Sequence, residues 1–142
     1  PEVSASCAKA WEAGSTTVTA VSAHTVADSI SVDLPRDGAR AVRAVRETHG
    51  AFVVVSDAEI LDAIAELGRE VAVFAEPAGA TAYAGLARAV GQGLVPADST
   101  VLVMNTGNGL KDVASARKAV AEPLRSAPTL ESLRAALAVR PA

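Results

Sequence analysis

A polar, glycine-rich turn that follows an apolar run is the segment of this sequence best suited to chemistry. Residues 101–104 read Val-Leu-Val-Met, and residues 105–112 read Asn-Thr-Gly-Asn-Gly-Leu-Lys-Asp. The apolar run predicts a buried strand over 100–104, and open α/β sheets bind ligands beyond the carboxyl ends of their strands. A site is therefore expected at this turn.

The glycines of the turn allow two interpretations. They would let backbone N–H groups approach a phosphate at the start of the following helix. The spacing, however, matches neither the G-x-G-x-x-G fingerprint nor a phosphate loop in which Ser or Thr follows Lys, and no acid is placed to bind a ribose. From composition and spacing alone, a structural turn without a ligand competes with a ligand site.

The elements that would position this turn alternate between helix and strand. Ser56-Asp57-Ala58-Glu59 is a capping box and gives the clearest helix start. Helices are predicted over 7–13, 37–48, from 57, over 78–90, from the turn to about 121, and from 129. Strands are predicted over 51–55, 71–74 and 100–104, and 15–21 has the alternation of a half-buried strand or an extended connector. Three or four strands with about six helices predict a layered α/β fold, and no linker divides residues 1–142.

Composition limits the possible partners. A chain of 142 residues is the size of one domain, and a net charge of -3 with a pI near 5.3 gives no basic surface for nucleic acid or an anionic membrane. The apolar runs are far shorter than the roughly 20 residues that span a bilayer. Cys7, His24 and His49 are too few to suggest a metal site. We predict a soluble, cytoplasmic protein with no metal, nucleic-acid or membrane partner.

Five segments in collinear order resemble the threonine synthase family. The turn at 105–112 resembles the family's Thr-Gly-x-Gly-Leu-Lys-Asp motif, and Phe-Ala-Glu-Pro-Ala-Gly-Ala at 74–80 resembles its Glu-Pro-Ala-Gly/Ser-Ala segment. The stretches at 24–30, 43–48 and 55–60 agree as well. Together they extend from about residue 24 to 113.

The resemblance implies an enzyme dependent on pyridoxal 5'-phosphate (PLP), of the tryptophan-synthase-like fold type II. It implies a three-layer αβα arrangement, of which this chain would form the C-terminal part of the large domain. Thr106 takes the position of the strand-end hydroxyl that meets the pyridine nitrogen, and we expect it in a cavity wall. Gly107 would allow close backbone approach to the ring, and Glu76 would line the cofactor site, although a charge at a helix start is its structural alternative. A neutral hydroxyl leaves the ring nitrogen largely unprotonated, which favours elimination and replacement over transamination.

The family's Schiff-base lysine and phosphate-binding loop are expected upstream of this chain, so no catalytic residue is assigned here. Lys111 lies outside the sequence context of that lysine. The resemblance implies a lyase, homodimeric when complete, that converts O-phospho-L-homoserine and water to L-threonine and phosphate, with the 142 residues inactive alone. Two alternatives stay open. One is a threonine or serine dehydratase or a cysteate-synthase-like enzyme, and the other is a non-catalytic binding module.

Overall fold

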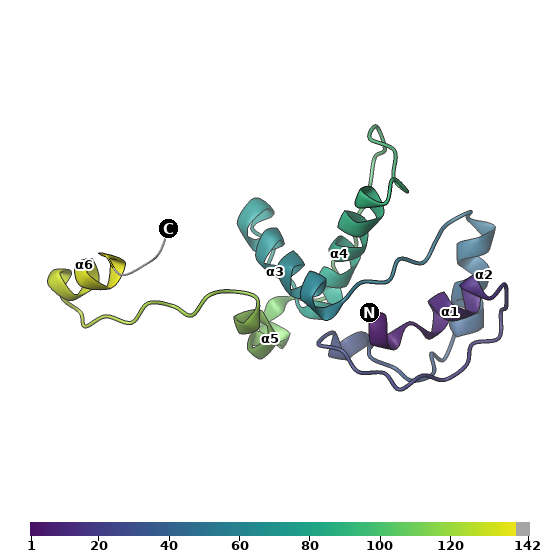
Figure 1. Ribbon diagram of the computed structural model, residues 1–142, viewed down its shortest axis with the longest axis horizontal. Coiled ribbons are helices and arrows are strands. Elements are labelled where there is room, and N and C mark those ends of the chain that lie inside the picture. The colour runs from purple at the N-terminus through teal and green to yellow at the C-terminus, as the bar shows by residue number, and fades with distance from the viewer. Residues whose placement is uncertain (139–142) are drawn as a thin grey trace.

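The computed structural model describes residues 1–138 and consists of helices joined by extended segments (Figure 1). In chain order the elements are the 3-10 helix η1 (Glu2–Ser4), α1 (Ser6–Glu12), the 3-10 helix η2 (Asp28–Ile30), α2 (Gly38–Glu47), α3 (Asp57–Val71), α4 (Pro77–Gly91), the 3-10 helix η3 (Gly109–Lys111), α5 (Val113–Lys118) and α6 (Leu130–Ala138). The predicted helices all form close to their predicted bounds, although α5 ends at Lys118 and not near 121.

The main core lies between α3 and α4, which converge at their lower ends in Figure 1. Apolar residues at the spacing of one helix face bury α3, and small residues let α4 approach closely. The buried residues of this core are Ala27, Val55, Ile60, Ala63, Ile64, Leu67, Ala75, Ala78, Ala80 and Ala84. Ile60 is completely inaccessible to solvent. The apolar face of α3 is thus the side that packs against α4.

The start of α3 is fixed by the predicted capping box. The Ser56 hydroxyl accepts from the Glu59 backbone N–H, and the Glu59 carboxylate accepts from the Ser56 backbone N–H at 2.7 Å. Arg88 of α4 forms a bidentate ion pair with the same carboxylate, with both N–O distances 2.8 Å. Its guanidinium also donates to the Val54 carbonyl. One carboxylate therefore ties together the helix start, the preceding segment and α4.

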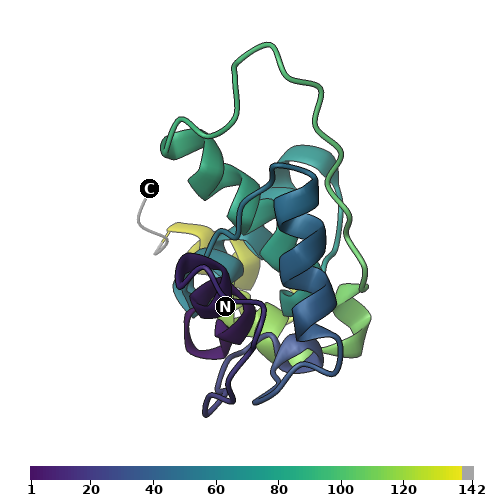
Figure 2. The ribbon, with the colours of Figure 1, turned by 90° about the vertical axis from the view of Figure 1, so that its right-hand side faces the viewer.

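A second, smaller packing unit is formed by α1 and α2, which contact each other and face the viewer in Figure 2. Val42 of α2 is completely buried. The Trp11 and Phe52 rings meet edge to face with centroids 6.2 Å apart. Arg46 donates to the Trp11 and Ser15 carbonyls, so this member of the arginine-rich helix has a structural role.

None of the predicted strands forms within residues 1–138, so the three-layer αβα arrangement is not confirmed for these residues. Segments 15–21, 51–55 and 100–104 form no strand. The Val21 N–H donates to the Asp33 carbonyl and the Val55 carbonyl accepts from the Glu2 N–H, but these single bonds do not build a ladder. Segment 71–74 contains the end of α3 instead. The described residues hold a single isolated antiparallel bridge, between Ala75 and Asn108. A strand is stable only when a neighbour accepts and donates its backbone hydrogen bonds, and the described segments do not meet to do so.

The segments after α4 carry many exposed apolar side chains. Leu102 is 87% exposed and Met104 is 68% exposed. An extended connection leads from α5 to α6, which stands apart from the other helices in Figure 1 and buries none of its residues. The leucine face predicted for this terminal helix, with Leu130, Leu133 and Leu137, is exposed. No helix within residues 1–138 has the length and apolar content needed to cross a membrane.

Candidate functional site

The glycine-rich turn is held against the start of α4 by backbone hydrogen bonds. The Glu76 N–H donates to the Gly107 carbonyl at 3.0 Å, and the Gly109 N–H donates to the Phe74 carbonyl at 2.9 Å. Asn108 lies between these bonds and forms the bridge with Ala75. Two segments about 30 residues apart in the sequence therefore meet at one place.

Glycine is required in this turn because of close approach, not because of its backbone angles. A Cβ atom at Gly107 would lie 1.7 Å from the Glu76 Oε1 atom, and one at Gly109 would lie 2.3 Å from the Phe74 ring. On the facing helix, a Cβ atom at Gly79 would lie 2.1 Å from the Asn105 side chain. The two segments can pack this closely only because side chains are missing at these three positions.

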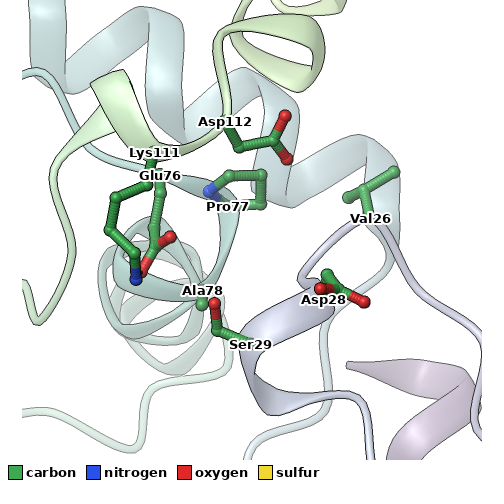
Figure 3. A pocket seen from close by; sticks show the side chains of 8 residues that line it. All are labelled: Val26, Asp28, Ser29, Glu76, Pro77, Ala78, Lys111 and Asp112. Carbon is green, nitrogen blue, oxygen red and sulfur yellow. The ribbon is translucent and has the colours of Figure 1, made fainter.

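A cavity of about 290 Å³ opens beside this junction (Figure 3). Its lining comes from three parts of the chain: the loop with η2, the start of α4, and the end of the turn. The lining residues are Val26, Asp28, Ser29, Glu76, Pro77, Ala78, Lys111 and Asp112. Three carboxylates and one ammonium group therefore surround the cavity.

The Glu76 carboxylate is buried and paired with Lys111. The Lys111 Nζ atom lies 2.9 Å from Glu76 Oε1, and Figure 3 shows the two side chains converging. The Glu76 side chain is 6% exposed, whereas the Lys111 side chain is 59% exposed. The pair therefore joins the last residue of η3 to the residue that precedes α4.

The other acidic side chains of the cavity belong to separate local structures. Asp112 accepts from the Ser115 backbone N–H at 2.9 Å and caps α5. This hydrogen bond lowers the pKa of Asp112 below its ordinary value. Asp28 is positioned indirectly, because the loop before η2 is anchored on α3: the Thr25 hydroxyl and the Val26 N–H both donate to the Asp57 carboxylate.

The predicted site residues are brought to the same turn but not into one cavity. Gly107 and Glu76 are buried and in contact, and Glu76 lines the cavity. Thr106 is exposed and is not among the residues that line this cavity. Its contact with a cofactor ring stays a prediction. Lys111 was not predicted as part of the site, although its place in the Gly-Leu-Lys-Asp sequence was a signal.

The chain belongs to a family of PLP-dependent enzymes. The family model described as "Pyridoxal-phosphate dependent enzyme" matches residues 1–107, which is more than half of the chain. These residues include α1 to α4 and the first part of the glycine-rich turn.

Within this family the chain is similar to threonine synthases. It is 43% identical over 95 residues to the threonine synthase of Mycobacterium tuberculosis, an alignment that covers 67% of this chain and 26% of the relative. Identity to the Synechocystis threonine synthase is 46% over 89 residues, which cover 63% of this chain and 23% of the relative. Identity to the Methanocaldococcus jannaschii threonine synthase is 33% over 102 residues, which cover 72% of this chain and 25% of the relative. The chain thus spans about a quarter of the length of these curated relatives.

The residues at the junction suit one end of PLP better than the other. An exposed Thr106 hydroxyl on a turn with a fixed backbone suits a ring nitrogen, which needs one neutral hydrogen-bonding partner. The cavity does not suit the phosphate, because Asp28, Glu76 and Asp112 would repel a dianion and Lys111 is already paired. The lining of the cavity therefore does not suit the phosphate group of the cofactor, and the contact of its ring with Thr106 stays a prediction.

Proposed function

We propose that this chain is the C-terminal part of the large domain of a PLP-dependent threonine synthase, which converts O-phospho-L-homoserine and water to L-threonine and phosphate. The observation that carries the proposal is the junction itself. The Glu-Pro segment at 74–80 and the Thr-Gly-Asn-Gly turn at 105–109, both of which resemble the family's motifs, meet through the bridge between Ala75 and Asn108. The identity of 43% to a curated threonine synthase supports the same assignment.

In this proposal the cofactor, when bound, withdraws electrons from the substrate's carbon skeleton. The Thr106 hydroxyl would donate one neutral hydrogen bond to the ring nitrogen and so leave that nitrogen largely unprotonated. Gly107 permits the turn to lie against Glu76 and thereby fixes the place of Thr106. Glu76 lines the wall of the cavity beside the turn. The lysine that binds the cofactor covalently, and the loop that binds its phosphate, belong to other parts of the enzyme.

The extended segments fit a larger α/β fold. We propose that 51–55 and 100–104 become strands of a sheet in the three-layer αβα domain of the complete enzyme, because both are apolar, β-branched segments and 100–104 exposes most of its apolar side chains. Leu102 at 87% exposure is the clearest example. The 142 residues alone are accordingly proposed to be inactive.

The complete enzyme is proposed to be a cytoplasmic homodimer without a nucleic-acid partner. A single cysteine, Cys7, suits a reducing compartment, and a net charge of -3 disfavours contact with a polyanion.

The test uses the complete protein that carries this chain. With O-phospho-L-homoserine it is expected to release phosphate and L-threonine in equal amounts. Production of a ketoacid from threonine, without phosphate release, would instead identify a dehydratase. The 142-residue chain, assayed in parallel with added PLP, is expected to release no phosphate.

The place of Thr106 is tested in the same protein. Thr106→Asp is expected to lower turnover by roughly 100-fold or more and to change the cofactor's absorbance, because a carboxylate favours the protonated ring nitrogen. Thr106→Ser keeps the hydroxyl and is expected to retain most of the activity. Wild-type turnover and absorbance in Thr106→Asp would remove Thr106 from the site.

A further inference from the structure

We propose that Lys111 is a positioning residue, which holds the turn carrying Thr106 by pairing with the buried Glu76 carboxylate. The effect of this pair on the cofactor rests on the proposed function, whereas its effect on the turn does not.

The first support for this inference is the position of the pair. Lys111 lies at the end of η3, and Glu76 lies directly before α4, so their 2.9 Å contact closes a loop between two segments 35 residues apart. The closed region contains the whole turn 105–111. The same turn is also linked to α4 and the preceding residues by backbone hydrogen bonds at Gly107 and Gly109 and by close packing at Gly79.

The second support is the burial of Glu76. A carboxylate that is only 6% exposed has lost most of its hydration, and a close charge or hydrogen-bond donor compensates for that loss. Lys111 is the sole cation among the residues that line the cavity. Removing it would leave Glu76 beside Asp28 and Asp112 without a compensating charge.

The third support is the contact between Glu76 and Gly107. The space that a Gly107 side chain would need is filled by the Glu76 carboxyl group, and the Glu76 N–H binds the Gly107 carbonyl. A displacement of the Glu76 side chain toward solvent would therefore remove the support of Gly107. Because Thr106 is the preceding residue, its hydroxyl would lose its fixed position.

Hydrogen exchange in the 142-residue chain tests the effect on the turn without any cofactor. The probes are the backbone amides of Glu76 and Gly109, which bond to the Gly107 and Phe74 carbonyls. Lys111→Met is expected to raise their exchange rates roughly threefold to tenfold, because local opening of the junction becomes easier. Lys111→Arg should restore slow exchange. Lys9→Met, at an exposed position of α1, serves as the matched control.

A double-mutant comparison shows whether Lys111 acts through Glu76. In a Glu76→Gln background the side chain keeps its shape but carries no charge, so Lys111→Met is expected to change the two exchange rates by less than about twofold. Equal exchange in Lys111→Met and Lys9→Met would overturn the inference. An undiminished effect of Lys111→Met in the Glu76→Gln background would also overturn it.

The complete enzyme separates this inference from the proposed function. There, Lys111→Met is expected to shift the absorbance of bound PLP and to lower kcat more than it raises KM, with Lys111→Arg close to wild type. If the wild-type enzyme shows no PLP absorbance while the exchange rates still respond to Lys111→Met, the proposed function fails and the role of the pair stands. If PLP binds but neither spectrum nor exchange responds, the role of the pair fails.

Discussion

The paired helices α3 and α4 and the extended segment 100–104 differ in how much of their structure is determined locally. α3 has a capping box at its start and an apolar face that α4 covers, and Ile60 on that face is fully buried. Segment 100–104 is also apolar, but Leu102 and Met104 remain exposed. A helix satisfies its own backbone hydrogen bonds, whereas an extended segment must find its partners elsewhere. Apolar side chains therefore form a packed core in one region and an open surface in the other.

The largest loss of stability is expected from a substitution in the packed region. Ile60→Ala is expected to lower the free energy of unfolding by about 2–5 kcal/mol, because it leaves a cavity in the core between α3 and α4. Leu102→Ala, on the exposed segment, is expected to change it by no more than about 0.5 kcal/mol in the 142-residue chain. Urea denaturation of the two variants measures both values. Equal losses would contradict the contrast between the regions.

The same pair of variants sharpens the comparison in the complete enzyme. If 100–104 becomes a covered strand there, Leu102→Ala is expected to cost about 2 kcal/mol or more. A loss that stays near zero in the complete enzyme would show that this segment is not covered.

The next effect concerns the junction at the turn. Gly107→Ala places a Cβ atom 1.7 Å from Glu76 Oε1 and is expected to cost about 1–3 kcal/mol by overpacking. Gly85→Ala meets nothing within 4 Å in the middle of α4 and is expected to raise stability by about 0.5–1 kcal/mol. Thermal denaturation of both variants is the measurement. A harmless Gly107→Ala would contradict the close approach.

A smaller effect on stability is expected from the capping box of α3, and it depends on pH. The hydrogen bonds from the Ser56 hydroxyl and backbone hold the pKa of Glu59 below its ordinary value of 4.5, and Arg88 adds to this. Since the folded pKa lies below the unfolded pKa, the stabilisation is complete above about pH 4.5 and is lost as the pH falls through the folded value. The stability difference between wild type and Glu59→Gln is therefore expected to shrink over that acidic range. A difference that stays constant with pH would contradict this assignment.

The smallest effect is at the end of α3. Ala72 ends the helix in the left-handed region, with φ of 54°, where glycine is usual. Ala72→Gly is expected to raise the free energy of unfolding by up to about 1 kcal/mol. Ala82→Gly, at an exposed interior position of α4, is expected to lower it by a similar amount. Chemical denaturation of the two variants tests the opposite signs.

Local signals in the sequence were enough to predict the helices. The Ser56 capping box and Pro77 in the first turn of α4 depend on neighbours within a few residues, and both have the predicted structure. The strands over 51–55 and 100–104 were predicted from apolar, β-branched runs, and neither forms in the described residues. Periodicity reports which residues favour extended backbone, but it does not supply a neighbouring strand.

The candidate site was predictable only in part, because local sequence signals do not report contacts between distant segments. The turn around Thr106 and Gly107 follows from its own sequence and from the resemblance to threonine synthases. The pair between Glu76 and Lys111 depends on a contact across 35 residues, which no local pattern reports. The two side chains meet only once the turn has folded against α4.

The three close-packed glycines also determine how this junction tolerates sequence variation. At Gly79, Gly107 and Gly109 any replacement introduces a Cβ atom within 2.3 Å of another group, whatever the polarity or size of the rest of the side chain. At Gly68 and Gly91 nothing lies within 4 Å of that atom. In a library of random substitutions selected for folded protein, the first three positions should retain glycine alone, while the other two should accept many residue types.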